Sequence, residues 1–307
     1  MGAQEDSDTG GNGAEGSDSK TEKVSFLVGN QRVSGQVWRS GAANGSVMVM
    51  AHGLGLLVSA GLPPFIERFV AAGVTVLAFD YRHFGESEGE PRQLVDVDHQ
   101  LEDWRAAIAY ATGLSGIDPA KLILWGTSFS GGHVLTVSAT LPGVAAVISQ
   151  VPHVNGPASS AASDTGNVAG LAVSSTADGA QRTVTIPFVG LPGDIALMTQ
   201  PGTRDAYLAL FPRGAPWTNE TPARFVLQLP NYSPDSVKRT EQPPVLVVVA
   251  TDDQVAPAAP AREFANATGA RLYEVRGGHF DVYSGPLFGD VITEELTFLR
   301  ELGLVAK

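Results

Sequence analysis

The chain has no cysteine among its 307 residues. This absence excludes disulfides, thiolate metal sites and a cysteine nucleophile, although it does not decide the compartment. Basic residues are also scarce, because 20 lysines and arginines stand against 32 acidic residues and leave a net charge of −12. Nucleic acids and anionic membrane surfaces bind clusters of basic residues, so this charge argues against both partners. No apolar run reaches the roughly 18 residues of a membrane span, and we expect none.

The sequence also lacks an HExxH motif and any cysteine–histidine spacing typical of zinc sites. We therefore expect neither a metal nor an organic cofactor. The start of the chain does not show the basic region followed by an apolar region that marks a signal peptide. We expect a cytoplasmic protein, and a secreted protein whose signal has been removed is the alternative.

What the chain does have is the composition of a globular protein with a large core, with 43% hydrophobic and 17% charged residues. Residues 1–23 are the exception, since they are rich in glycine, serine and acidic residues and have almost nothing apolar. We predict that this tail is disordered, because it cannot bury enough surface to offset the entropy of ordering.

From residue 24 onward the hydrophobic pattern predicts an α/β fold. Two alternating runs, 24–28 and 32–38, flank Gly29 and Asn30 and predict a hairpin. Wholly apolar runs separated by amphipathic ones follow, and they indicate a mainly parallel sheet with helices on both faces. The predicted strands are 47–51, 74–80, 122–125, 145–151, 245–250 and 272–275, and the predicted helices are 64–72, 94–112, 131–141, 260–268 and 288–302.

The run LWGTSFSGGH at residues 124–133 predicts a strand, a sharp turn and a helix. Such a turn holds Ser128 away from its own backbone at the carboxyl end of the sheet, where its hydroxyl can reach a substrate. Gly126 leaves room for the turn, and Ser130 stands where the usual pattern has a second glycine. Ser128 is therefore the candidate nucleophile, and an ordinary turn with a capping serine is the alternative.

Two backbone amides are candidate oxyanion donors. Strand 47–51 is followed by HGLG at residues 52–55, where small residues allow close approach and the amide of Leu54 can point at a developing oxyanion. The second expected donor is the amide of Phe129, which directly follows the nucleophile. We interpret His52 as a structural histidine that fixes this loop.

The loop DYRHFGESEG at residues 80–89 also follows a predicted strand. Asp80 and Arg82 could be mistaken for a catalytic pair, but we favour a structural ion pair that shapes the loop. His83 is expected at the surface of this loop.

Two further motifs stand at strand ends near the carboxyl terminus. Asp252 and Asp253 follow strand 245–250, where a carboxylate can orient a catalytic histidine and stabilise its cation. Neighbouring residues that leave a strand point in different directions, so only one of the two can do this. His279 follows strand 272–275 on a loop that can place its ring over the edge of the sheet.

The set HGLG, DYRHFG, GTSFSGG, DxxxP and GGHFD resembles an α/β-hydrolase-fold serine hydrolase over residues 24–304. The order serine, acid, histidine is the one typical of that fold. The resemblance implies a triad of Ser128, Asp253 and His279, because family patterns place the acid four residues before a proline such as Pro257. More narrowly, LWGTSFSGGH with GGHFDVY resembles a bacterial and fungal group of hydrolases whose fungal relatives include acyl-transferring or polyketide-releasing enzymes.

The resemblance also implies a cap over the site. Residues 153–242, here called the cap segment, form an insertion that a core of residues 24–152 and 243–307 does not need. Their apolar stretches, such as 225–229, are interpreted mainly as the core of the cap, and the lining of an acyl pocket is the alternative. Residues 161–180 are small and polar, which indicates either a lid or a loosely packed helix.

The predicted function is hydrolysis of a carboxylic ester, or a related acyl bond such as a thioester, in a small-molecule substrate through an acyl-enzyme. Acyl transfer or thioester hydrolysis in secondary metabolism is the alternative that uses the same residues. A peptidase is neither supported nor excluded by the residues. A ligand-binding protein on a hydrolase fold is a distant alternative, because such proteins often lack part of the triad.

Overall fold

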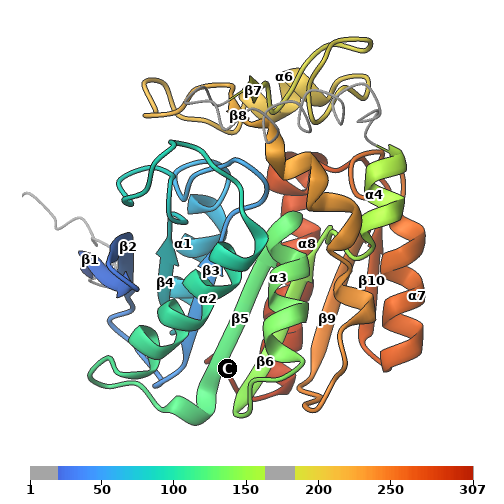
Figure 1. The fold of residues 1–307 in the computed structure, drawn as a ribbon. Coiled ribbons are helices and arrows are strands. Elements are labelled where there is room, and N and C mark those ends of the chain that lie inside the picture. The colour runs from blue at the N-terminus through green and yellow to red at the C-terminus, as the bar shows by residue number, and fades with distance from the viewer. Residues whose placement is uncertain (1–19, 163–183, 307) are drawn as a thin grey trace, which may run out of the picture.

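A computed structural model describes residues 20–162 and 184–306 of the chain. Its core is an eight-stranded sheet in the order β1-β2-β4-β3-β5-β6-β9-β10 (Figure 1). β1 pairs antiparallel with β2 and β2 antiparallel with β4, whereas the other pairings are parallel. The strands are β1 (Lys20–Val28), β2 (Gln31–Arg39), β3 (Val47–Ala51), β4 (Thr75–Phe79), β5 (Leu122–Thr127), β6 (Val144–Gln150), β9 (Val245–Ala250) and β10 (Arg271–Val275).

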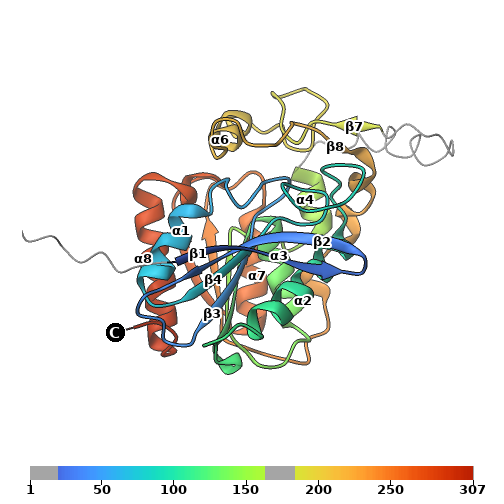
Figure 2. The ribbon, with the colours of Figure 1, turned by 90° about the vertical axis from the view of Figure 1, so that its left-hand side faces the viewer.

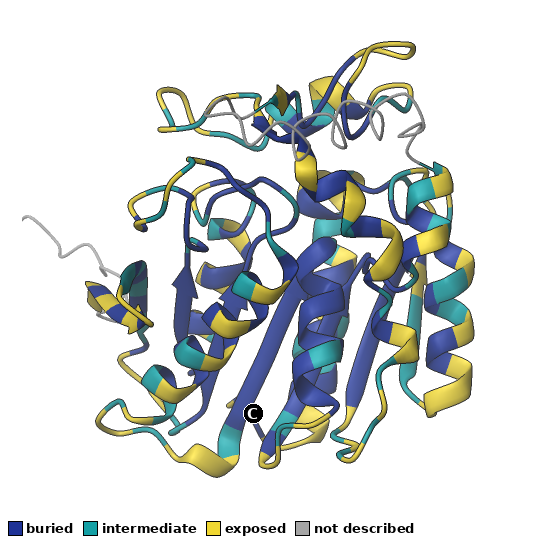
Figure 3. Ribbon diagram, in the orientation of Figure 1, coloured by how far each residue is buried: buried dark blue, intermediate teal, exposed yellow. Residues whose placement is uncertain are grey.

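Helices cover both faces of this sheet (Figures 1 and 2). One face packs on α2 (Val97–Thr112), α3 (Phe129–Ser138) and α7 (Ala258–Thr268), and the other on α1 (Pro63–Ala71) and α8 (Gly285–Glu301). Successive strand residues point to opposite faces of the sheet. Leu124 packs in the core beneath α2, α3 and α7, and Trp125 packs in the core beneath α1 and α8. The central strands β3 to β6 and β9 are almost wholly buried, which explains why they lack a polar alternation (Figure 3).

These elements confirm the predicted α/β sheet, and the differences lie at their ends. β1 begins at Lys20, because its partner β2 extends to Arg39 and pairs with it there. Treating residues 20–23 as part of a disordered tail was therefore wrong, while residues 1–19 lie outside the described part of the chain. α2 begins at Val97, later than predicted, where the Asp96 carboxylate accepts the His99 N–H at 3.2 Å and caps the helix.

Most of the described part of the cap segment lies over the carboxyl ends of the strands, and its last residues return along the core to the start of β9 (Figures 1 and 2). Gln93 joins the core to the cap segment. Its side-chain oxygen accepts the Thr218 N–H at 2.9 Å, and its backbone carbonyl accepts the Thr221 hydroxyl at 2.9 Å. Most of the predicted lid, 161–180, lies outside the described residues. The elements of this segment are α4 (Gly156–Ala162), β7 (Thr185–Ile186), α6 (Thr203–Leu208), β8 (Thr221–Pro222) and the 3-10 helices η2 (Ala223–Leu227), η3 (Leu229–Asn231) and η4 (Pro234–Ser236).

Among the described helices, none combines the length and apolar character needed to cross a bilayer.

A carboxyl group is buried between α8 and the sheet. Glu295 is fully buried, and its Oε1 accepts the Trp125 Nε1–H at 3.1 Å. Its Oε2 has no hydrogen-bond partner among the described residues. Burial raises the pKa of the Glu295 carboxyl well above its usual range, because the charged form would be poorly solvated there.

Because of this buried carboxyl, we expect the free energy of unfolding to fall as pH rises. The unfolded chain loses the Glu295 proton near pH 4.5, whereas the folded chain retains it to higher pH. The contribution of Glu295 to the free energy of unfolding is therefore complete below pH 4.5 and is lost as the pH rises above it. Glu295→Gln keeps the acceptor for Trp125 and should gain stability over the wild type by up to about 1.4 kcal/mol per pH unit in that range. Urea denaturation of both proteins at several pH values from 5 to 8.5 measures this difference. A difference that does not change with pH would contradict it.

Candidate active site

Ser128 is the single residue between the end of β5 and the start of α3, and it forms a tight turn. Its backbone, with φ 58° and ψ −120°, lies outside the regions that residues other than glycine usually adopt. A Cβ atom at Gly126 would lie 2.2 Å from the Ser130 carbonyl oxygen, so the turn closes only with glycine at that position. The turn presents the Ser128 side chain at the carboxyl edge of the sheet.

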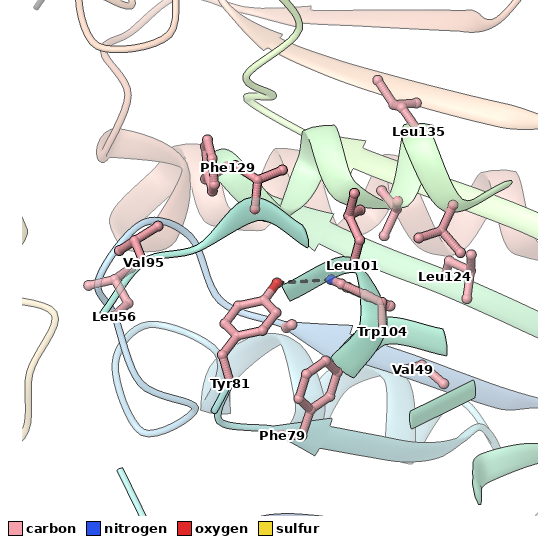
Figure 4. Packing of buried hydrophobic residues seen from close by; sticks show 14 of the residues in the cluster. Val49, Leu56, Phe79, Tyr81, Val95, Leu101, Trp104, Leu124, Phe129 and Leu135 are labelled. Atoms are coloured by element: carbon pink, nitrogen blue, oxygen red, sulfur yellow. Dashed lines mark hydrogen bonds between the residues drawn. The ribbon is translucent and has the colours of Figure 1, made fainter. Parts of the chain in front are cut away.

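Ser130 occupies the position where the usual pattern has glycine. Its Oγ lies 2.8 Å from the Tyr81 hydroxyl, which also accepts the Trp104 Nε1–H at 2.9 Å (Figure 4). All three side chains are buried, so the Ser130 hydroxyl supplies a partner to a Tyr81 oxygen that water does not reach. The sequence carries no signal for this contact, because Tyr81 and Ser130 are 49 positions apart.

Ser128, His279 and Asp253 form a hydrogen-bonded line. The Ser128 Oγ lies 2.9 Å from His279 Nε2, and His279 Nδ1 lies 2.6 Å from Asp253 Oδ2. The His279 and Asp253 side chains are 3% and 1% exposed. The other Asp253 oxygen accepts the backbone N–H groups of Val255 and Ala256, both at 2.8 Å. These bonds fix the carboxylate, so it can hold the ring of His279 in one orientation.

Asp252 does not share this arrangement. It is exposed, and its Oδ1 accepts only a long bond, 3.4 Å, from the hydroxyl of Thr251. Its backbone N–H donates to the Gly277 carbonyl at 2.9 Å, which joins the two loops that carry Asp253 and His279. The structure therefore brings Asp253, and not Asp252, to His279.

The loop after β3 approaches Ser128 from the other side. A Cβ atom at Gly53 would lie 2.8 Å from the Cβ of Ser128, so the Gly53 backbone packs directly against the Ser128 side chain. His52 Nδ1–H donates to the Gly53 carbonyl at 2.9 Å, and the trans peptide then directs the Leu54 N–H away from that ring. Neither the Leu54 nor the Phe129 N–H donates to another described residue. Among the described residues, both N–H groups are therefore without a hydrogen-bond acceptor.

His52 forms its hydrogen bond within its own loop, to the Gly53 carbonyl. It is 1% exposed, and burial lowers its pKa to about 4, so the ring is neutral at pH 7. Its Nε2 has no hydrogen-bond partner among the described residues and lies 3.7 Å from Asp80 Oδ1. Asp80 accepts the Val58 N–H at 2.7 Å, and burial raises the pKa of its carboxyl to about 6.

Two predictions for the loop at residues 80–89 were wrong. Arg82 does not pair with Asp80. Its guanidinium binds the buried Asp103 on α2, and the other oxygen of Asp103, Oδ2, accepts the backbone N–H of Arg82 at 2.9 Å. His83 is not at the surface, because it is 3% exposed and stacks on His99 with ring centroids 5.8 Å apart. In both cases the partner comes from α2, which the local sequence of the loop cannot reveal.

A cavity of about 40 Å³ adjoins Ser128 and is mostly apolar. Besides Ser128, its polar lining residues are His153 and Ser159. His153 Nε2–H donates to the Tyr232 carbonyl at 2.8 Å, so its Nδ1 accepts the Ser159 hydroxyl at 2.8 Å, and burial lowers the pKa of His153 to about 4. The apolar lining residues come from core and cap segment and are Leu54, Phe129, Leu197, Met198, Phe225, Leu229, Val255 and Ala256. Part of the stretch 225–229 thus lines a pocket as well as packing inside the cap segment.

No cluster of three or more histidine, aspartate or glutamate side chains within the described residues is placed to hold a metal ion.

Some known proteins are similar to this chain in sequence, and others are similar in fold. The chain is 43% identical over 262 residues to the quorum-quenching protein AidA of Acinetobacter baumannii, covering 83% of this chain and 86% of that one. It is 39% identical over 131 residues to the thiohydrolase aneE of Aspergillus aculeatus, covering 42% and 41% of the two chains. Among solved structures, the α/β hydrolase GrgF from a Penicillium species superposes with a TM-score of 0.77 over 92% of this chain and 98% of that one, at 23% identity.

The match to a family extends over most of the core and the whole cap segment. Residues 42–277 match the family described as serine aminopeptidase, S33. The strand order, the turn at Ser128 and this match agree with one another. The chain therefore belongs to the S33 serine aminopeptidase family and is a serine hydrolase of the α/β-hydrolase fold.

Proposed function

We propose that this hydrolase cleaves a carboxylic ester or a related acyl bond through a covalent acyl-enzyme on Ser128. The observation that carries the proposal is the hydrogen-bonded line from Ser128 Oγ through His279 to Asp253, with distances of 2.9 and 2.6 Å. A serine hydroxyl is a weak nucleophile until a base takes its proton, and this line supplies the base and the group that orients it.

In the proposed acylation step, Ser128 Oγ attacks the carbonyl carbon while His279 Nε2 takes the hydroxyl proton. The carbonyl oxygen becomes negative and receives hydrogen bonds from the N–H groups of Leu54 and Phe129. When the intermediate collapses, the bond to the leaving group breaks and His279 returns the proton to it. Water then attacks the acyl-enzyme by the same route and releases the acid, and Ser128 regains its proton.

The apolar cavity beside Ser128 supports an uncharged acyl group as the part of the substrate that binds there. An aminopeptidase has to bind a cationic amino group, and the residues that line this cavity include no carboxylate. The similarity to a quorum-quenching protein supports a small signal molecule as one substrate class. We therefore favour ester chemistry over peptide cleavage within this family.

A second candidate is cleavage or transfer of a thioester-bound acyl group, which the similarity to a thiohydrolase favours. The same acyl-enzyme serves both reactions, and the acceptor alone distinguishes hydrolysis from transfer. Turnover of one acyl ester in the presence of added alcohols or amines separates the two. A new ester or amide that accumulates in place of the acid would assign transfer.

Replacement of the nucleophile tests the proposal. Ser128→Ala should lower kcat roughly 10⁶-fold on whichever substrate the wild type accepts, because the covalent route is lost. The measurement is release of product from p-nitrophenyl esters of increasing chain length, acyl lactones and acyl thioesters by both proteins. A variant that keeps most of the wild-type activity would exclude Ser128 as the nucleophile.

The two adjacent aspartates provide a matched pair for the acid. Asp253→Asn should lower kcat about 10³- to 10⁴-fold, because an amide no longer holds the required tautomer of His279 or stabilises its cation. Asp252→Asn removes the same charge from an exposed neighbour and should stay close to the wild type. Kinetics of the two variants on one ester decide between them, and a larger loss for Asp252→Asn would move the acid by one residue.

A further inference from the structure

The Leu54 N–H belongs to a four-residue turn, residues 53–56, here called the oxyanion turn. The Leu56 N–H donates to the Gly53 carbonyl at 3.3 Å and closes it. Gly55 has φ 71°, which is the value that the third residue of a type II turn requires. Such a turn leaves the carbonyl groups of its two central residues, Leu54 and Gly55, without partners inside the turn.

Two aromatic side chains of the cap segment bind these two carbonyls. The Tyr207 hydroxyl donates to the Leu54 carbonyl at 3.0 Å, and the Trp217 Nε1–H donates to the Gly55 carbonyl at 2.7 Å. Phe188, also from the cap segment, lies against the same turn, because a Cβ atom at Gly55 would stand 2.4 Å from its ring. The cap segment therefore covers the oxyanion turn and hydrogen-bonds to it.

The same cluster of rings reaches the loop that carries His279. The Tyr207 ring packs edge-on against Phe280 with centroids 6.0 Å apart, and Phe280 packs against His279 at 4.9 Å. Tyr207 and Trp217 also contact each other, at 5.9 Å. Tyr207 is 2% exposed, so loss of the bond to the Leu54 carbonyl would leave a largely buried hydroxyl with a free-energy cost.

These contacts determine where the Leu54 N–H points. The N–H lies in the peptide plane that His52 holds through the Gly53 carbonyl, and the next plane is held by Tyr207 through the Leu54 carbonyl. When both planes beside one residue are fixed, its two backbone dihedrals are fixed as well. An oxyanion donor stabilises the transition state only when it is already aimed at the position of the negative charge.

We propose that Tyr207 and Trp217 are positioning residues for the Leu54 N–H, so the oxyanion hole is complete only while the cap segment is seated on the core. His52 holds the turn from the core side, and the two aromatic residues hold it from the cap side. This inference rests on the proposed function, because it assumes that Leu54 serves an acyl-enzyme formed on Ser128.

Tyr207→Phe is the direct test, since it keeps the ring and removes only the hydroxyl. We expect kcat to fall about 10- to 100-fold, less than the loss of an entire donor would cause, while KM changes by less than about threefold. The affinity for an alkyl boronic acid, which forms a tetrahedral adduct with the active serine, should fall by about the same factor as kcat. Trp217→Phe removes the second donor and should act in the same direction.

Tyr232→Phe is the matched control. It also removes a buried hydroxyl from the cap segment, but this hydroxyl lies 2.7 Å from His133 and 3.1 Å from Thr136, both on α3, and does not contact the oxyanion turn. Its kcat and boronic acid affinity should stay near those of the wild type. Thermal unfolding and circular dichroism of all three variants show whether each is folded at the assay temperature.

Wild-type kcat and boronic acid affinity in folded Tyr207→Phe would overturn the inference, as would an equal loss in Tyr232→Phe. If Tyr207→Phe does not fold, the same comparison is made with Trp217→Phe, and wild-type values there would also overturn it. Ser128→Ala separates this result from the proposed function. An inactive Ser128→Ala beside a fully active Tyr207→Phe rejects the positioning role alone, whereas an active Ser128→Ala rejects both.

Discussion

The chain has to change direction at Ser128, from β5 into α3, and the site is arranged around this one residue. A non-glycine backbone at φ 58° and ψ −120° persists only where its surroundings fix it. Here the Ser128 N–H donates to the Gln150 carbonyl at 2.8 Å, and the Ser128 carbonyl accepts the His153 N–H at 2.9 Å. Both partners lie at or just after the carboxyl end of β6, so the strand beside β5 holds Ser128 in its turn.

The core and the cap segment contribute differently to the site. The core supplies the hydrogen-bonded line of Ser128, His279 and Asp253, each just after the end of a parallel strand, because such strands end at the same edge of the sheet. The cap segment supplies much of the apolar cavity and the hydrogen bonds to the oxyanion turn. Under the proposed mechanism, the cap segment would both enclose the acyl group and fix the backbone donor that stabilises the transition state.

The sequence was sufficient to predict the sheet and the residues at its edge, since apolar runs and strand-end motifs are local patterns. It was insufficient where a side chain binds a distant partner that no strand-end motif indicates. Arg82 binds Asp103 on α2 rather than its neighbour Asp80, and the Ser130 hydroxyl is explained only by Tyr81. The contacts of Tyr207 and Trp217 were missed for the same reason, because they join positions more than 150 apart.

The most direct test of the proposed nucleophile is to measure the intact mass of the protein after incubation with a fluorophosphonate probe. The labelled peptide is then mapped. We expect one adduct per chain, on Ser128, because the hydroxyl that His279 activates should be the reactive one. The Ser128→Ala variant should remain unlabelled. An adduct on another serine, or none on folded wild-type protein, would contradict the assignment of an activated nucleophile at the turn between β5 and α3.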